Sequence, residues 1–546
     1  MKKISLLLIF ISTFSFGQKY HFTHQDTLRG SITKERVWWN LLHYKLELAV
    51  HPKDKFIKGK NTIQYKVLKP YQTLQIDLQT PLKITKVCQN NIELEVTSDG
   101  FAHFIKLKKR QITGKTNEIT VFYEGNPVES KRPPWSGGFS WKKDKNGNDF
   151  IATTCQGIGA SIWWPTKDHM YDEPDKGMDI IITTPKNLMN ISNGRLIKTV
   201  QNNNKTITYH WNVKNPINNY GVNVNIGKYV HFSEKYNGEN GTLGCDYYVL
   251  EYNLAKAKKQ FTQVKKMLQA FEYWFGPYPF YEDGFKLVEV PYLGMEHQSS
   301  VTYGNKYKNG YLGRDLSGSG WGLKFDFIII HESGHEWFAN NITYKDAADM
   351  WIHEGFTTYS ETLYLDYHFG TKAGNEYAQG TRRNIRNRTP IIGVYNVNKE
   401  GSGDMYSKGA NMIHTYRQLV NNDKKFRKIL RGMNKKFYHQ TVTTQQIETY
   451  LSTQLGQDLT GFFNQYLRSI KIPKLEYKIL KNSIQYRFIN IVDGFSMPIK
   501  VYLNKKPKWI TPTKKWKKLK TTSQNTVFSV DANFYIRSKK ISPQKP

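Results

Sequence analysis

Two short stretches decide the fold, namely Ile328-Ile329-Ile330-His331-Glu332-Ser333-Gly334-His335 and, fifteen residues further on, Trp351-Ile352-His353-Glu354. The apolar residues before His331 are typical of a buried helix. His331 and His335 lie about 40° apart around such a helix, so both imidazoles point the same way. Two neutral imidazoles suit Zn²⁺ and leave room for a third ligand and a water molecule. Glu332 can then take a proton from that water.

A third ligand is needed, because the five-residue pattern also occurs in ordinary helices that carry two histidines at the edge of a core. Glu354 is the candidate, since a helix, a loop and an antiparallel helix would return it to the two histidines. Glu361 lies two turns further along the same helix face. It either accepts a hydrogen bond from a ligand imidazole or is a surface carboxylate.

The whole chain predicts a multidomain protein. Its 546 residues are 39% hydrophobic and 14% aromatic, which excludes a mainly disordered chain. Alternating apolar and polar residues from Tyr44 to about Val230 predict an all-β domain, 18–237. From Leu254 the period becomes 3.6, which predicts an α+β domain, 238–470. We expect its helices at 255–275, 324–340, 351–368, 406–420, 424–433 and within 443–470, and a Gly/Ser-rich loop at 310–322.

A small β domain, 471–546, closes the chain, because strand patterns return at Leu475. It holds 18 Lys and Arg against 3 Asp and Glu, in a chain of net charge +34. Its densest stretch is Lys514-Lys515-Trp516-Lys517-Lys518-Leu519-Lys520. This stretch is either a patch for a polyanion or cell surface, or a solvated strand face. We predict the solvated face and no nucleic-acid partner, because no nucleic-acid motif accompanies it.

Residues 1–17 have the pattern of a secretory signal peptide. Lys2 and Lys3 precede an apolar run that ends at Phe16, and small residues occupy positions 15 and 17. A buried first helix or an uncleaved anchor is the alternative. We expect export, to the periplasm or the medium, and a mature chain that starts at Gln18 and has no transmembrane segment.

The three cysteines are too few for a disulfide-built scaffold. Cys88, Cys155 and Cys245 cannot all pair within one chain, although one disulfide is possible. We expect three buried thiols that act as small hydrophobic side chains.

These residues together resemble the zinc aminopeptidases of the aminopeptidase N and leukotriene hydrolase family, within the gluzincins. The resemblance begins with H-E-x-x-H, eighteen residues and a Glu, and covers about residues 44 to 470. Four further segments resemble family motifs in order and rough spacing. They are Thr154-Cys155-Gln156, Asp172-Glu173-Pro174, Leu293-Gly294-Met295-Glu296-His297 (G-x-M-E-N in the family) and Tyr406-Ser407-Lys408-Gly409-Ala410 (Y-x-K-G-A).

The resemblance implies an N-terminal saddle-like β domain and a thermolysin-like catalytic domain. It implies one Zn²⁺ per chain, with His331, His335 and Glu354 as ligands. It also implies that Glu332 is the general base and that Tyr406 donates to the oxyanion formed during peptide hydrolysis.

On the substrate side, the resemblance implies that Glu296 pairs with the free α-ammonium of a peptide, with Gln156 beside it. Gly294 and Met295 would line the same site. The expected function is therefore secreted zinc-dependent aminopeptidase activity. A zinc endopeptidase or epoxide hydrolase on the same scaffold is the alternative, followed by a non-catalytic binding protein.

The sequence departs from the family pattern at four positions, namely Leu293, His297, Glu336 and His353. These departures concern the shape of the substrate pocket and leave the metal ligands in place. The long helical C-terminal domain of many family members is also missing, since 76 residues follow Ile470.

Overall fold

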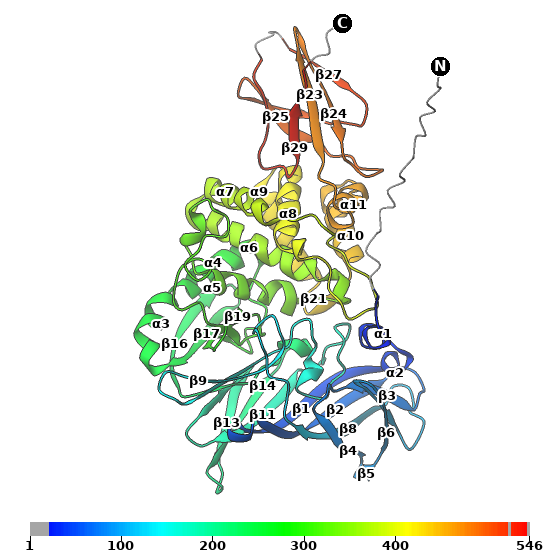
Figure 1. Cartoon of the computed structure of the whole chain (residues 1–546), viewed down its shortest axis with the longest axis vertical. Coiled ribbons are helices and arrows are strands. Elements are labelled where there is room, and N and C mark those ends of the chain that lie inside the picture. Colours follow the sequence, from blue (N-terminus) through cyan, green and yellow to red (C-terminus); the bar gives the residue numbers. More distant parts are fainter. Residues whose placement is uncertain (1–20, 522–525, 543–546) are drawn as a thin grey trace, which may run out of the picture.

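The computed structural model describes residues 21–521 and 526–542 (Figure 1). The predicted signal peptide, 1–17, lies outside these residues. The described chain forms an N-terminal β-rich part, a helical middle part and a small β domain at the opposite end (Figure 1). This confirms the expected multidomain fold, and no long helical domain follows the middle part within the described residues.

The N-terminal part begins with two short helices, α1 (His24–Gly30) and α2 (Lys34–Val37), followed by three sheets. The largest sheet has the order β13 (Arg195–Gln201), β14 (Thr206–Val213), β11 (Met178–Pro185), β1 (Trp39–His51), β2 (Phe56–Val67), β8 (Thr116–Gly125), β4 (Lys83–Gln89), β5 (Ile92–Glu93). The second has the order β3 (Thr73–Asp77), β7 (Ala102–Lys106), β6 (Glu95–Asp99). The third has the order β12 (Met189–Ile191), β15 (Asn225–Gly227), β10 (Asp149–Thr154), β9 (Gly138–Lys143).

Alternation along the strands explains this part of the fold. In β1, Tyr44, Leu46, Leu48 and Val50 are buried in one core cluster, while the residues between them are more exposed. A period of two places these side chains on one face of the sheet, which packs against the other sheets. Cys88 on β4 is only half-buried, so the prediction of three buried thiols is wrong for this residue. All three cysteines are free thiols, and the structure contains no disulfide between them.

The middle part contains a five-stranded sheet in the order β16 (Tyr229–Gly238), β17 (Gly241–Leu250), β18 (Phe285–Glu289), β20 (Val301–Tyr303), β19 (Gly294–Met295). The expected domain boundary at 237/238 falls in the last two residues of β16, just before the turn to β17, and both strands belong to this sheet. A small pair, β21 (Ile342–Tyr344) and β22 (Gln440–Val442), joins distant segments. The helices are α3 (Leu254–Gln260), α4 (Gln263–Phe275), α5 (Phe327–Gly334), α6 (Trp351–Phe369), α7 (Thr371–Thr381), α8 (Ser407–Val420), α9 (Asp423–Lys436), α10 (Thr444–Leu455) and α11 (Thr460–Leu467).

The helix expected at 324–340 is shorter than predicted. It begins after Asp326, whose side chain accepts hydrogen bonds from the first backbone amides, and it ends at Gly334. A π-type turn, Glu336–Asn340, follows and is kinked at Phe338 and Ala339. The helix expected at 255–275 is divided into α3 and α4.

The C-terminal domain consists of two small sheets. Their orders are β27 (Lys517–Lys520), β24 (Ser483–Ile489), β23 (Lys474–Leu480), β29 (Arg537–Lys540) and β26 (Lys506–Ile510), β25 (Ile499–Leu503), β28 (Phe528–Val530). Their inner residues share one core cluster with the helices of the middle part. Among the residues described, no helix has the length and apolar character that a membrane crossing requires.

Candidate metal centre and active-site cleft

Three predicted ligands meet between α5 and α6. His331 and His335 come from the end of α5, and Glu354 comes from the first turn of α6. One ligand atom from each lies within 4.8 Å of the other two. Glu354 Oε2 is 3.7 Å from His331 Nε2 and 3.4 Å from His335 Nε2. All three side chains are buried, so little of their surface is exposed to solvent.

The hydrogen bonds of both imidazoles fit a metal centre. His331 Nδ1 lies 2.7 Å from Glu361 Oε1, and His335 Nδ1 lies 3.0 Å from the carbonyl oxygen of Phe338. Each Nδ1–H therefore has an acceptor, which leaves the lone pair of each Nε2 directed at the centre of the trio. Glu354 Oε2 is buried without a hydrogen-bond partner. Such an orphaned oxygen is the remaining donor that a cation would take.

Glu361 is the carboxylate that orients His331. It is 1% exposed and also accepts a hydrogen bond from Tyr377. The alternative that Glu361 lies on the surface is therefore wrong. Two neighbours fix its carboxylate, so the ring of His331 is held in one orientation.

Glu332 lies beside the trio and faces the cleft. Burial raises the pKa of Glu332 to about 7, which suits a group that gains and loses a proton near neutral pH. Tyr406 precedes α8, and its ring stacks at 6.1 Å from the ring of His331. Tyr406 is 37% exposed and lines the cleft, but burial around its hydroxyl and the nearby carboxylates Glu354 and Glu296 raise the pKa of the phenol, so it keeps the proton that it would donate.

Glu296 and Gln156 meet on the other side of the trio. Gln156 Nε2 donates to Glu296 Oε1 at 2.6 Å and to Glu354 Oε1 at 3.2 Å. The hydroxyl of Tyr220 donates to Glu296 Oε1 at 3.2 Å. Glu296 follows β19 and Gln156 follows β10, so both parts of the protein contribute to the site. Glu296, Glu332 and His335 also form a second possible metal trio, but Glu296 already has two hydrogen-bond donors.

A cleft of about 890 Å³ opens over these residues. Its walls come from the N-terminal part, the strand segment with Gly294 and Met295, and the loop before Tyr406. The rim carries Trp135, which is 70% exposed. A cleft of this size accommodates several residues of an extended peptide.

The four departures from the family pattern lie at different places. Leu293 lines the cleft. His297 is fully buried behind it, with Nε2 unpartnered. His353 Nε2 accepts the backbone amide of Tyr344, and Glu336 Oε1 accepts that of Ser299. Of these four, only Leu293 lines the cleft, and the other three are buried outside its lining.

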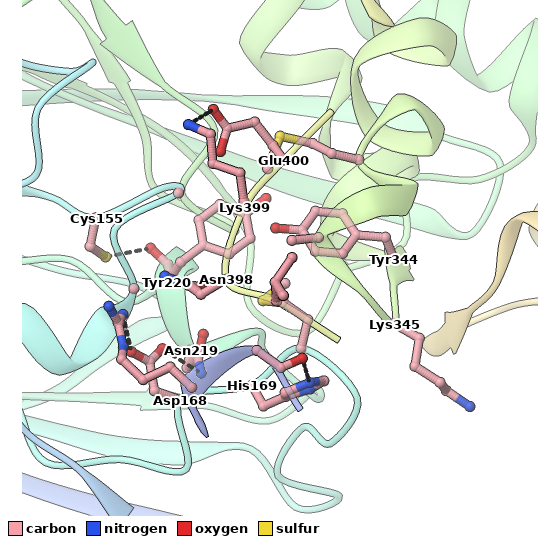
Figure 2. Close-up of a pocket in the computed structure, with 18 residues that line it drawn as sticks. Cys155, Asp168, His169, Asn219, Tyr220, Tyr344, Lys345, Asn398, Lys399 and Glu400 are labelled. Carbon is pink, nitrogen blue, oxygen red and sulfur yellow. Dashed lines mark hydrogen bonds and ion pairs between the residues drawn. The ribbon is translucent and has the colours of Figure 1, made fainter. Parts of the chain in front are cut away.

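A second, much smaller cavity of about 50 Å³ lies beside the cleft (Figure 2). Tyr220 and Tyr344 line it from opposite sides, and Asn398, Lys399 and Glu400 line both this cavity and the cleft (Figure 2). Its volume suits a few water molecules. The thiol of Cys155 in its wall donates to the carbonyl oxygen of Tyr220, and burial raises its pKa. Cys155 is therefore not a nucleophile.

Three residues of the site were not predicted from the sequence. Tyr220 bonds Glu296, Tyr377 bonds Glu361, and the hydroxyl of Thr357 lies 3.1 Å from His335 Nδ1. Thr357 lies one turn after Glu354 on α6, so helical spacing alone could have placed it near the metal ligands. Tyr220 and Tyr377 carry no such signal, because they reach the site only through tertiary packing.

Fold and site together define a multidomain protein with a buried metal centre at the base of a cleft between its N-terminal and middle parts. Comparison with known proteins agrees with this class. The model of the peptidase M1 N-terminal domain matches residues 40–220, and that of the peptidase family M1 domain matches residues 259–466. Together these matches cover more than half of the chain. The chain belongs to peptidase family M1.

Individual relatives are distant. Probable aminopeptidase 2 of Sulfurisphaera tokodaii is 22% identical over 87% of this chain and 58% of its own length. Tricorn protease-interacting factor F2 of Thermoplasma volcanium is 24% identical over 42% of this chain and 28% of its own length. Leukotriene A-4 hydrolase of Xenopus laevis is 22% identical over 76% of this chain and 68% of its own length. The chain thus spans between about a quarter and two thirds of these relatives.

A solved M1 zinc metallopeptidase from Deinococcus radiodurans, bound to a Tyr-Ser-Ala substrate, has the same fold. Its TM-score is 0.65 at 19% identity, over 79% of this chain and 94% of that chain. The two imidazoles and one carboxylate, together with membership of family M1, identify the metal of this site as Zn²⁺.

Proposed function

We propose that this protein is a zinc-dependent aminopeptidase that removes N-terminal residues from peptides. The observation that carries this proposal is the buried carboxylate of Glu296, tied through Gln156 to the metal ligand Glu354. A carboxylate held at a fixed place beside the metal centre selects a cation at that place. The free α-ammonium of a peptide is such a cation, and its position next to the scissile bond limits cleavage to the first residue.

The roles of the other residues follow from the chemistry of peptide hydrolysis. A bound Zn²⁺ supplies Lewis-acid activation of water and of the scissile carbonyl. Glu332 accepts the proton of the attacking water and returns it to the leaving amine, for which a pKa of about 7 is suited. Tyr406 donates its phenolic hydrogen to the oxyanion that develops on the carbonyl oxygen. We expect one Zn²⁺ per chain, held by His331, His335 and Glu354.

The test compares each peptide with its N-acetylated form. Acetylation removes the cation and leaves Glu296 opposite an uncharged amide, so kcat/KM should fall by roughly two orders of magnitude or more. Glu296→Ala should remove most of this discrimination and reduce activity on free N-termini. Zinc content serves as the control, because Glu296 is not among the proposed ligands.

Equal kcat/KM for free and acetylated peptides would contradict the aminopeptidase proposal and favour an endopeptidase. Turnover of an epoxide without peptide cleavage would favour the hydrolase alternative. A pure, zinc-loaded protein without either activity would favour a binding protein.

Export is a separate part of the proposal. The support is the order of charged, apolar and small residues in positions 1–17. N-terminal sequencing of the protein from its native host should then begin at Gln18, in the periplasm or the medium. A first residue of Met1 on the purified protein would contradict it.

A further inference from the structure

The C-terminal domain gathers its positive charge on one side of a sheet. In the four-stranded sheet β27-β24-β23-β29, paired residues point to the same face, and successive residues alternate between faces. Pairing joins Lys478 to Gln485, Gln485 to Lys518, and Glu476 to both Arg487 and Lys539. By this register and alternation, seven cations lie on one face of the sheet. We call it the basic face, and its cations are Lys474, Lys478, Arg487, Lys518, Lys520, Arg537 and Lys539.

The opposite face of this sheet is occupied by the domain core. Leu475, Ile484 and Phe488 are buried in the cluster that joins the two C-terminal sheets to the catalytic helices. The basic face is therefore the side that remains for a partner. It lies at the end of the molecule opposite the N-terminal part, away from the catalytic cleft (Figure 1).

Acidic partners for this face are almost absent within the protein. Its one carboxylate, Glu476, is held by Arg487 through Nε and Nη2. In the described chain no ion pair involves the other six cations. The residues outside the description, 1–20, 522–525 and 543–546, contain no Asp or Glu that would change this.

Such a face works against the stability of the domain. Lys474 and Arg537 are direct cross-strand partners, and like charges placed directly opposite destabilise a sheet. A strand face needs some charged residues to stay solvated, but it does not need seven cations with a single carboxylate among them. The last 76 residues hold 18 of the chain's 79 Lys and Arg but only 3 of its 45 Asp and Glu. This imbalance is what a binding surface for a polyanion requires.

We propose that the basic face binds an acidic polysaccharide, whose carboxylate or sulfate groups recur along an extended chain. Cations spaced by the strand separation of about 4.8 Å and the two-residue repeat of about 6.7 Å offer a regular two-dimensional array for such groups. Gln485, half-buried amid the array, adds an amide for sugar hydroxyls. The ring of Trp516 lies against Lys478 at 4.8 Å and Arg487 at 4.6 Å, which provides an apolar surface for a sugar ring.

Two other classes of polyanion fit the face less well. A membrane-binding surface inserts large apolar side chains between its cations, but the exposed hydrophobic residues of this domain, Trp509 and Val527, lie outside the four-stranded sheet. Single-stranded nucleic acid needs several aromatic rings for successive bases, and Trp516 is the single aromatic side chain that contacts these cations among the described residues.

The test measures binding of the full-length mature protein to polygalacturonate, with dextran as the neutral polymer. The variant carries Lys478→Gln, Lys518→Gln, Lys520→Gln and Lys539→Gln. The matched control carries Lys83→Gln, Lys108→Gln, Lys198→Gln and Lys205→Gln, four exposed lysines of the N-terminal part with no ion pair in the described structure. Both variants have the same net charge, so they separate a site from a general electrostatic effect.

We expect the wild type and the control variant to bind polygalacturonate at low salt and to release it as salt rises. The basic-face variant should bind about tenfold or more weakly, with a smaller dependence on salt. Thermal unfolding of each variant shows that the fold is retained. Equal weakening in both variants, or no binding by the wild type, would overturn the proposal. Tighter binding to phosphatidylglycerol vesicles or to single-stranded DNA than to polygalacturonate would overturn the choice of polysaccharide.

Discussion

The buried carboxylates around the metal centre differ in their hydrogen-bond partners, and these partners decide what each carboxylate does. Glu361 has both oxygens engaged, by His331 and Tyr377, so it is fixed in place. Glu354 keeps one oxygen without a partner. Burial alone would raise the pKa of Glu354, but the neighbouring His335 and His331 rings lower it, so it remains an anionic ligand. Glu332 is neither fixed by hydrogen bonds, as Glu361 is, nor placed as a ligand, as Glu354 is. It lines the cleft, where a substrate would bind.

At Glu332, substitution by Gln separates metal binding from catalysis. The amide keeps the volume and polarity of the side chain but cannot accept the proton of water. Glu332→Gln should therefore keep stoichiometric zinc and lose roughly two to four orders of magnitude in kcat. Elemental analysis and steady-state kinetics measure the two quantities. A variant that turns over peptides at the normal rate would place the general base elsewhere.

At Glu361, substitution by Gln tests whether this residue orients a ligand. Glu361→Gln replaces the carboxylate that accepts from His331 Nδ1, so zinc affinity should fall by about 10- to 100-fold. Competition with a chelator measures this affinity, and kcat at saturating zinc should stay close to normal. Tyr377→Phe is the matched control, because it removes only the second contact of the same carboxylate and should have a smaller effect. Unchanged zinc affinity in Glu361→Gln would assign it a purely structural role.

At the scale of elements, α6 and α8 approach each other through two glycines. A Cβ on Gly409 would lie 3.1 Å from Gly355 Cα, and one on Gly355 would lie 3.4 Å from Gly409 Cα. Gly355 directly follows the ligand Glu354, and Gly409 lies three residues after Tyr406. The close contact of the two helices therefore sets the distance between the metal centre and the phenol.

Gly409→Ala should separate the helices by a few tenths of an ångström. Because a displacement of about 1 Å can lower a rate about 100-fold, we expect kcat to fall by roughly tenfold, with KM and zinc content nearly unchanged. Kinetics and elemental analysis of the folded variant check this. A normal kcat would show that the site tolerates the shift, and a loss of zinc would move the effect from Tyr406 to the ligands.

The same elements show what the sequence predicts and where it fails. Ligand spacing predicts that His331, His335 and Glu354 meet, because helix geometry is local and regular. The end of α5 was predicted six residues too late. Beyond Gly334 the carbonyl oxygens of Phe338 and Ala339 accept hydrogen bonds from the hydroxyls of Thr357 and Thr343. Those hydroxyls come from later segments, so the apolar periodicity through 340 carries no information about them.

At the scale of the whole molecule, the cleft depends on a segment far from it in sequence. Helix α1 lies against the loop that lines the cleft before Tyr406 (Figure 1). The backbone amide of Asn398 donates to the carbonyl oxygen of Asp26 at 2.9 Å. Two arginines hold α1 in turn. Arg29 of α1 bonds Asp168, and Arg36 of α2 bonds Asp77 and donates to the carbonyl oxygens of Leu28 and Arg29. Helix α1 thus supports the wall formed by Asn398, Lys399 and Glu400.

The closest approach of α1 to the cleft loop is at Gly30. A Cβ on Gly30 would lie 2.0 Å from the carbonyl carbon of Val397 and 2.2 Å from the amide nitrogen of Asn398, and backbone atoms cannot yield as a flexible side chain does. Gly30→Ala should therefore displace the loop, and we expect kcat/KM on peptides to fall by roughly 10- to 100-fold while zinc content stays normal. Ile32→Ala, at an exposed position just beyond α1, should leave kcat/KM unchanged. Normal kcat/KM in a folded Gly30→Ala protein would show that the cleft loop keeps its position without α1.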